Sequence, residues 1–274
     1  MIRLPIPLSG ISQEAIFDKC VSGFSSKRSQ GIITRLNGIR QTVIDDSKEY
    51  RKGPQEFKET HSLPNYPEPA KDDLVNLYDK KFAAKRSPGR MFYDKIKYSS
   101  MHDRCALCGV GTVSTLDHYL PKSKYPTLSV TPSNLVPSCA ICNNAKKEES
   151  DRLLVHAYFD RIPNDEPWLF AEIVSSDPIA VNYNVSCPKH WDKDLAQRIC
   201  NQFEILDLGS LYSMRASEEI ANHMDSYLTI YRESGKELLE KILESNIRTA
   251  DRDSKYWLAA LYRALKQYFA SRLN

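Results

Sequence analysis

Long hydrophobic runs are missing from this chain of 274 residues. The longest uninterrupted apolar stretch, Tyr256 to Tyr262, has seven residues, whereas a membrane-spanning helix needs about twenty. No apolar run of signal-peptide length follows the first ten residues. We therefore expect a soluble, cytoplasmic protein that does not enter a membrane.

A glycine-rich phosphate-binding loop is also missing, so any ATP hydrolysis must come from another chain. No internal repeat is evident. The net charge of +3 is too small to indicate a partner by itself. What the chain does have, 41% hydrophobic and 27% charged residues, is enough to bury a core.

Seven cysteines in an apparently cytosolic chain indicate metal binding or catalysis before disulfides. Four of them form two C-x-x-C pairs, Cys105/Cys108 and Cys139/Cys142. A two-residue gap lets both sulfurs of a turn face one metal, and two such turns complete a tetrahedral site. We therefore predict structural zinc. The remaining three are expected to be small buried hydrophobic residues: Cys20, Cys187 and Cys200.

Positive charge is concentrated around the first cysteine pair. From Lys80 to Lys124 the chain has ten basic and three acidic residues, and the rest of the chain is mildly acidic. Basic density beside a zinc site indicates a polyanion such as nucleic acid. A solvated helix face would give the same density, so charge alone leaves both interpretations open.

Short elements are predicted between and after the cysteine pairs. Apolar and β-branched residues predict a strand over residues 113–120, which Pro121 ends. Residues 134–138 predict a second short strand, and a helix is expected from Cys142 onward. The predicted order is strand, long loop, strand and helix, with zinc at its base.

This pattern resembles the HNH endonucleases, the ββα-metal group of nucleases. Besides the cysteine pairs, the matching features are Asp117 and His118 followed by a proline, the Asn134-Leu-Val strand, and C-x-x-C-N-x-x-K with Asn143 and Lys146. The resemblance covers residues 105–147. It implies a zinc-stapled finger that cuts nucleic acid with the help of a second metal ion.

The residue types suit phosphodiester hydrolysis. His118 is the expected general base, because an imidazole titrates near neutral pH. Asp117 and Asn143 offer oxygen ligands for catalytic Mg²⁺ or Mn²⁺. The resemblance implies that Asn134 supports the loop and orients the histidine, and a role as a mere strand-edge residue stays open. The lysines expected to meet phosphate groups are Lys146, one turn after Asn143, and Lys122 and Lys124 in the loop.

Some of these positions keep alternatives. Neighbouring residues on a regular strand point to opposite faces, so Asp117 and His118 serve one site only if the strand is irregular near its end. Asn144 is an alternative to Asn143 as metal ligand, although the N-x-x-K spacing favours Asn143. His102 is an alternative zinc ligand, although four cysteines already fill a closed site.

Two longer sequence segments are similar to HNH proteins of bacterial antiphage systems, namely Asp117 to Pro126 and Val155 to Asp160. They most resemble the Septu-type nuclease subunit, which works beside an ATPase and also occurs with some retrons. This resemblance implies an ATPase partner and a role in antiviral defence.

The predicted fold is α+β and mostly helical, in three parts. Residues 1–70 form an N-terminal segment with a proline-rich arm, residues 71–160 hold the nuclease module with its basic helices, and residues 161–274 form a small β segment and a helical subdomain. Helices are expected over 33–50, 72–84, 90–99 and from Trp191 to the end, with Gly209 and Gly235 between them, and strands over 168–174 and 179–185.

The sequence therefore predicts a metal-dependent HNH endonuclease acting on nucleic acid, with DNA favoured and RNA or tRNA also open. The main alternative is a zinc-stabilised nucleic-acid-binding module without catalysis, in which the Asp-His pair is incidental. A third possibility is a scaffold subunit of a defence complex. Cleavage of nucleic acid by the wild type but not by His118→Ala would separate the enzyme from the binding module.

Overall fold

The computed structural model describes residues 2–61, 70–176 and 179–272. The chain forms two compact units, Ile2–Asp160 and Arg161–Asn274. Both combine helices with a two-stranded sheet, which confirms the expected α+β, mostly helical class. The three-part division of the sequence stays a prediction, and most of its proline-rich arm lies outside the described residues.

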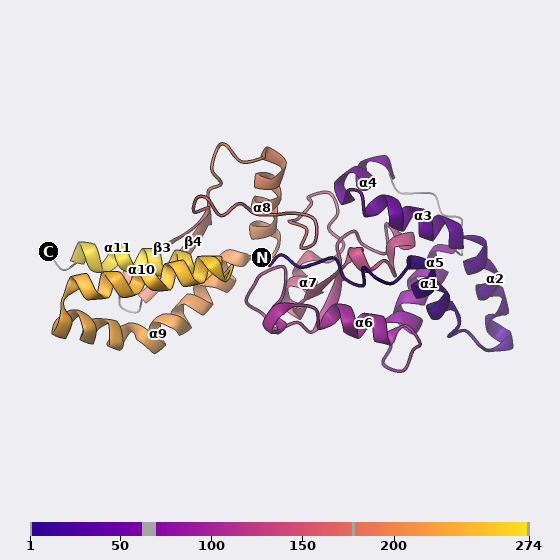
Figure 1. The fold of residues 1–274 in the computed structure, drawn as a ribbon, viewed down its shortest axis with the longest axis horizontal. Coiled ribbons are helices and arrows are strands. Elements are labelled where there is room, and N and C mark those ends of the chain that lie inside the picture. The colour runs from indigo at the N-terminus through magenta and orange to yellow at the C-terminus, as the bar shows by residue number, and fades with distance from the viewer. Residues whose placement is uncertain (1, 62–69, 177–178, 273–274) are drawn as a thin grey trace. The chain divides into compact units, whose positions relative to one another are not determined.

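The first unit consists of short helices around a small antiparallel sheet (Figure 1). In that sheet, β1 (Thr115–His118) pairs with β2 (Leu135–Ser138), and Asp117 lies opposite Val136. The helices are α1 (Gln13–Val21), α2 (Gln30–Gly38), α3 (Arg40–Tyr50), α4 (Pro54–Thr60), α5 (Ala70–Leu77), α6 (Arg90–Lys97) and α7 (Ala140–Lys146).

Two of the expected helices differ from the prediction. The helix expected over 33–50 is interrupted after Gly38, because glycine is a poor helix former. The helix expected over 72–84 ends as α5 at Leu77 and continues as a π-helical turn, Tyr78–Phe82. Such turns are rare in proteins, and those that occur often lie at functional sites. This one lies against the candidate site.

One hydrophobic core joins the N-terminal helices to the sheet. Phe17 of α1, Leu74 of α5 and Ile96 of α6 are buried in the same cluster as Leu116 of β1. Cys20 belongs to this cluster, as predicted, and burial raises the pKa of its thiol to about 12. The helices that precede the cysteine pairs therefore support the sheet directly.

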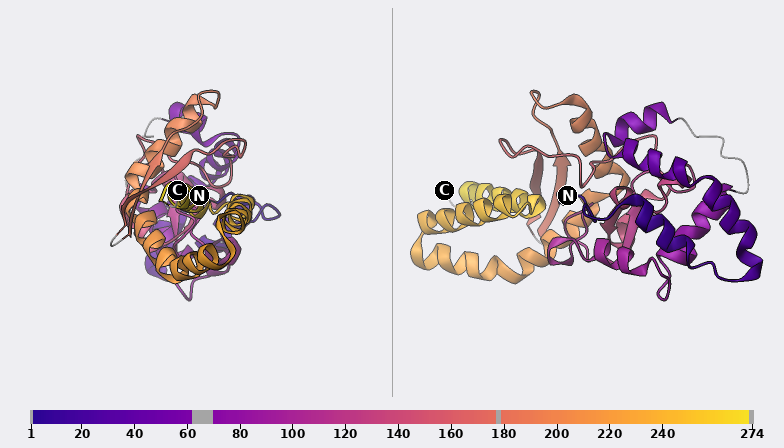
Figure 2. Two further views of the ribbon diagram at one scale, coloured as in Figure 1. Left: turned by 90° about the vertical axis from the view of Figure 1, so that its left-hand side faces the viewer. Right: turned by 45° about the vertical axis from the view of Figure 1, so that its right-hand side comes forward.

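The second unit packs a β-hairpin against long helices (Figure 2). The expected strands are confirmed as β3 (Leu169–Ser176) and β4 (Ile179–Val185), which pair antiparallel. α11 (Tyr256–Arg272) packs on β3 and α9 (Leu208–Ser234) on β4. α10 (Lys236–Arg252) contacts both of these helices, and α8 (Lys193–Ile205) contacts α9. Residues 177 and 178 of the expected turn lie outside the described residues.

Some details of this unit correct the sequence analysis. Gly235 separates α9 from α10 with φ of +84°, as expected of a glycine. Gly209 does not separate helices, because it lies in the first turn of α9, and the break precedes it at Asp207. Cys187 and Cys200 are only half-buried, and burial, with Cys200 nearby, raises the pKa of the Cys187 thiol to about 11. Among the described helices, none has the length and apolar character to cross a membrane.

Candidate active site

The four paired cysteines come together beside the sheet. Their sulfur atoms all lie within 4.8 Å of one another, and all four residues are buried. Sulfur ligands around tetrahedral zinc, with Zn–S bonds of about 2.3 Å, are about 3.8 Å apart. The cluster therefore has the dimensions and the ligand chemistry of one zinc site. His102, the alternative ligand, is exposed and lies outside it.

The backbone around the cluster suits thiolate ligands. The N–H of Gly111 donates to Sγ of Cys108 at 3.3 Å, and the N–H of Cys142 donates to Sγ of Cys139 at 3.5 Å. A Cβ at Gly111 would lie 2.8 Å from Sγ of Cys139, so only glycine fits there without a shift. Because Cys139 caps α7, zinc at this cluster would fix the start of the helix that carries Asn143.

A pocket of about 260 Å³ lies beside β1 and α7. Four of the predicted site residues line it, namely Asp117, His118, Lys122 and Asn143. Asn144, the alternative metal ligand, is exposed and does not line the pocket. Residues from the end of a strand, the following loop and the zinc-capped helix thus meet at one place.

Asp117 and His118 reach this pocket from different sides, which answers the strand-alternation problem. Asp117 contacts Lys146 on α7, whereas His118 contacts Ser129 in the long loop and Tyr78 in the π-helical turn. β1 ends at His118, so the pocket lies where the regular strand stops. Two neighbouring residues with opposite surroundings can therefore serve one cavity.

His118 is held by a backbone carbonyl and an aromatic ring. Its Nε2 lies 2.9 Å from the carbonyl oxygen of Ser129. Its ring forms an edge-to-face contact with the ring of Tyr78, at a centroid distance of 4.4 Å and an interplanar angle of 68°. Because a carbonyl only accepts, Nε2 must carry the proton, and Nδ1 of the neutral imidazole keeps its lone pair. Burial lowers the pKa of His118 to about 3, opposed by the Ser129 bond and reinforced by Lys122 and Lys146, so the imidazole is neutral at pH 7 and does not titrate near neutral pH as the sequence led us to expect.

Asp117 is paired with a buried lysine. Nζ of Lys146 lies 3.1 Å from Oδ2 and 3.3 Å from Oδ1 of Asp117, and it donates to the carbonyl of His118 at 2.6 Å. The side chains of Lys146 and Asp117 are 2% and 3% exposed. Burial raises the pKa of Asp117, while Lys146 opposes that shift. Lys146 is therefore engaged inside the protein here, and it does not reach the surface where we expected it to meet a phosphate.

Asn134 holds, by hydrogen bonds, the loop whose Ser129 carbonyl contacts His118. Its Oδ1 accepts from the N–H of Leu120 at 2.8 Å, and its Nδ2 donates to the carbonyls of Leu120 at 3.0 Å and Leu128 at 3.4 Å. It is fully buried and is not among the residues that line the pocket. Since Leu128 precedes Ser129, the clamp also holds the carbonyl that orients His118.

The π-helical turn supplies contacts that the sequence analysis missed. Tyr78 lines the pocket, and Nζ of Lys122 lies 4.9 Å from the centre of its ring. Lys122 also forms an ion pair with Asp79. Tyr78 and Asp79 lie far upstream of the motif, and Ser129 acts through its backbone, so residue type carried no signal for them. The helix expected over residues 72–84 was the one hint, and it marked none of its residues as part of the site.

Asp117 and Asn143 suit a divalent metal ion. Both line the pocket, and Oδ2 of Asp117 is buried without accepting a hydrogen bond from any described residue, although the charge of Lys146 is near. A carboxylate oxygen and an amide oxygen are the hard ligands that Mg²⁺ or Mn²⁺ prefers, and such ions usually keep several waters. The residues present therefore fit the ion that the sequence pattern implies.

Comparison with known proteins agrees with this arrangement. Residues 104–149 match the HNH endonuclease family, so the first unit carries an HNH domain with a four-cysteine cluster. Over nearly its whole length the chain is similar to Protein ea31 of Escherichia phage lambda, at 28% identity over 294 residues that cover 97% of each chain. That name states no activity. No solved structure matches the chain.

Proposed function

We propose that this protein is a metal-dependent endonuclease that hydrolyses phosphodiester bonds of nucleic acid. The observation that supports it most is that Asp117, His118, Lys122 and Asn143, all within the HNH match, line one pocket. The bond from Nε2 of His118 to Ser129 leaves Nδ1 as the basic nitrogen. A base, two oxygen ligands and a cation are the components that phosphodiester hydrolysis needs.

Each residue then has a distinct task. His118 takes a proton from the attacking water at Nδ1, while Ser129 and Tyr78 hold the imidazole in place. Lys122 adds positive charge on the pocket wall beside the phosphate. The buried ammonium group of Lys146 favours the ionised form of Asp117. Mg²⁺ or Mn²⁺, when held by Asp117 and Asn143, would supply Lewis-acid stabilisation of the phosphate and the leaving oxygen.

A cleavage assay tests this proposal. Purified full-length protein is incubated with duplex DNA, single-stranded DNA and tRNA side by side, with Mg²⁺ or Mn²⁺ and without either. We expect cleavage of DNA that His118→Ala reduces at least about a hundredfold, the lower end of general-base contributions. His223→Ala is the matched control, because His223 lies in the second unit and is half-exposed beside Glu219.

The rival function is nucleic-acid binding without catalysis. This rival is favoured if the wild type retards the migration of DNA but releases no more product than His118→Ala. The result must hold with every metal ion and on every substrate. Cleavage of tRNA alone would keep the enzyme and change its substrate from DNA to RNA. The assay is repeated with the proposed ATPase partner present, because a nuclease that is inactive without its partner would otherwise be mistaken for a binding module.

The biological setting that we propose is antiphage defence beside an ATPase. The support is the similarity of Asp117 to Pro126 and of Val155 to Asp160 to HNH subunits of such systems. The phage lambda relative shows that a chain of this length and sequence type is also encoded by a phage, which suits competition between phages in one host. Plating of phages on cells that express the wild type or His118→Ala, with and without a neighbouring ATPase gene, tests this setting.

A further inference from the structure

The segment from Asp79 to Tyr98 carries positive charge that the first unit leaves unpaired. It has seven basic and two acidic residues. Both acids are already engaged, because Asp79 pairs with Lys122 and Asp94 pairs with Arg90. Several cations of the segment form no ion pair with any described residue, namely Lys80, Lys85, Arg86, Lys95 and Lys97.

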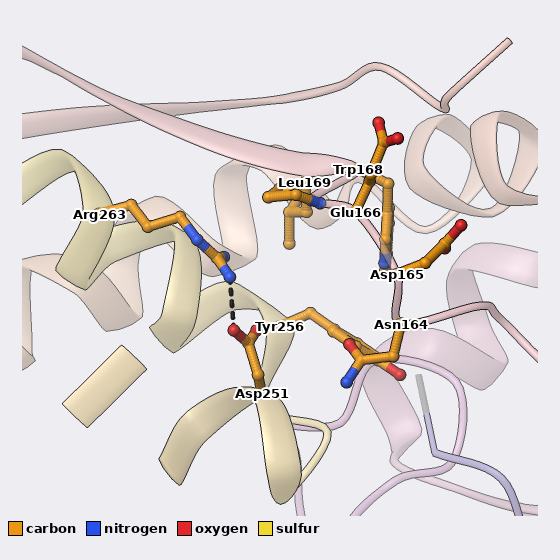
Figure 3. A pocket seen from close by; sticks show the side chains of 9 residues that line it. Asn164, Asp165, Glu166, Trp168, Leu169, Asp251, Tyr256 and Arg263 are labelled. Atoms are coloured by element: carbon orange, nitrogen blue, oxygen red, sulfur yellow. Dashed lines mark hydrogen bonds and ion pairs between the residues drawn. The ribbon is translucent and has the colours of Figure 1, made fainter. Parts of the chain in front are cut away.

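Two cations of the second unit show the contrast. Arg263 pairs with Asp251 on the wall of a pocket that Trp168 also lines (Figure 3). Lys266 of α11 pairs with Glu244 of α10 at 2.6 Å. Such pairs neutralise charge that a partner could otherwise use, whereas the unpaired cations of the first unit keep their charge for a polyanion.

One face of α6 exposes large apolar side chains beside this charge (Figure 1). Met91, Lys95 and Tyr98 are spaced i, i+4 and i+7, so they share one side of the helix. Met91 is 49% and Tyr98 is 63% exposed. The opposite side of α6 lies in the core through Phe92, Tyr93 and Ile96. The outward side therefore combines flat apolar surface with a free ammonium group.

The ring of Tyr98 is held next to a second ammonium group. Nζ of Lys97 lies 5.2 Å from the centre of that ring. Because the residue is still 63% exposed, much of the ring stays open to solvent. Bases of a single strand stack on such rings whatever their identity, and neighbouring basic groups follow the phosphates. In a duplex the base faces are covered by their neighbours, so only an unpaired base can use this ring.

The π-helical turn connects α6 with the candidate active site. Tyr78, which lines the active-site pocket, stacks on Phe82 at a centroid distance of 5.6 Å, and Phe82 contacts Tyr93 of α6 at 6.2 Å. α6 also packs on β1, the strand that ends at His118. A strand bound to α6 is therefore held by an element that packs directly on the site.

We propose that the exposed face of α6 binds a single strand of nucleic acid that extends from the cleavage site. The ring of Tyr98 stacks on one unpaired base, and Lys95 and Lys97 contact the neighbouring phosphates. This inference rests on the proposed nuclease function and names the substrate class, a nucleic acid with an unpaired segment. DNA and RNA offer the same stacking and phosphate chemistry.

Fluorescence anisotropy on the full-length protein tests this surface. Labelled oligo(dT), oligo(U) and a blunt DNA duplex are titrated without divalent metal ions. We expect both single strands to bind more tightly than the duplex, and Tyr98→Ala to weaken their binding at least about fivefold, the lower end of the contribution of one stacked base. Tyr98→Phe keeps the ring and should bind like the wild type.

The salt dependence tests the two lysines separately. Each phosphate contact to a single strand contributes about 0.7 to the slope of the logarithm of the binding constant against the logarithm of the salt concentration. Lys95→Ala combined with Lys97→Ala should therefore lower the magnitude of this slope by about 1.4. Lys193→Ala combined with Lys241→Ala is the matched control, because both lysines are exposed in the second unit. Phe170→Ala is the control for the ring, because Phe170 of β3 is 38% exposed.

The outcomes separate the possibilities. Whichever of oligo(dT) and oligo(U) binds more tightly, a loss confined to Tyr98→Ala and the α6 lysine variant supports the site and identifies the preferred sugar. No binding of either single strand, equal affinities of Tyr98→Ala and the wild type, an unchanged salt slope, or the same losses in the control variants would overturn it. Single-strand binding that needs Tyr98, in a protein that cuts no substrate, would support this surface and contradict the nuclease proposal.

Discussion

The buried pair of Lys146 and Asp117 leads to a quantitative prediction for Lys146→Met. The two side chains are 2% and 3% exposed, and Nζ of Lys146 contacts both carboxylate oxygens as well as the carbonyl of His118. Methionine keeps the apolar stem but leaves the carboxylate buried without its cation. Removal of one partner of a buried ion pair costs about 3–5 kcal/mol. We expect a loss of that size in the free energy of unfolding of the first unit.

The distribution of tryptophan provides the assay. The chain has three tryptophans, Trp168, Trp191 and Trp257, and all lie in the second unit. In urea denaturation, tryptophan fluorescence therefore follows the second unit, whereas far-UV circular dichroism follows both. Lys146→Met should shift the part of the circular dichroism transition that belongs to the first unit and should leave the fluorescence transition in place.

Two further measurements identify the cause. Adding Asp117→Asn to Lys146→Met removes the stranded charge, so the double variant should be more stable than Lys146→Met alone. Added Mg²⁺ should stabilise Lys146→Met more than the wild type, because the ion replaces the missing cation at Asp117. A cost below about 1 kcal/mol, the range of exposed ion pairs, would refute the buried-pair argument, as would an equal shift of the fluorescence transition.

Four other perturbations test the surroundings of the site. Wild-type protein is expected to contain one zinc ion per chain by elemental analysis, and Cys142→Ser should lose it and with it the folded finger, since structural zinc contributes about 10–16 kcal/mol in small fingers. Gly111→Ala should weaken zinc retention against a chelator, because its Cβ would meet the cysteine cluster at 2.8 Å; Gly38→Ala, which meets no atom within 4 Å, should retain zinc like the wild type. Tyr78→Leu should lower kcat for cleavage about tenfold or more with little change in KM, because it loosens the general base. Asp79→Asn should instead lower KM, because it releases the charge of Lys122 for the phosphate; an unchanged KM would argue against a phosphate contact of Lys122.

Features that depend on short-range spacing were predictable from the sequence. The two C-x-x-C turns predicted a four-cysteine cluster, and the structure assembles it. Pro121 predicted the end of a strand expected over residues 113–120, and the structure has the shorter strand β1 over Thr115–His118. Within each C-x-x-C turn and at the end of the strand, the relevant neighbours are a few residues apart, so local geometry determines the outcome. The two turns lie thirty residues apart, and it was the ligand chemistry of one tetrahedral metal that predicted their meeting.

Features that depend on long-range packing were not predictable. A lysine one turn after Asn143 is typical of an exposed helix face, and only the packing of α7 on β1 shows that Lys146 lies inside. The carbonyl of Ser129 carries no side-chain signal, and the pairing of Asp79 with Lys122 joins segments 43 residues apart. In the second unit, Trp168 and Arg263 are likewise brought to one pocket by the hairpin-on-helix packing.

The contacts of the candidate site also define the size of the nuclease. Residues 104–149 match the HNH family and contain the cysteine cluster, the proposed base and both proposed metal ligands. The ring that packs against His118 and the acid that pairs with Lys122 come from the π-helical turn at Tyr78–Phe82, outside that segment. The turn follows α5, whose side chains lie in one core with α1, α6 and β1. Since the proposed base is contacted from inside and from outside that segment, the proposed catalytic body is the whole unit Ile2–Asp160 rather than residues 104–149 alone.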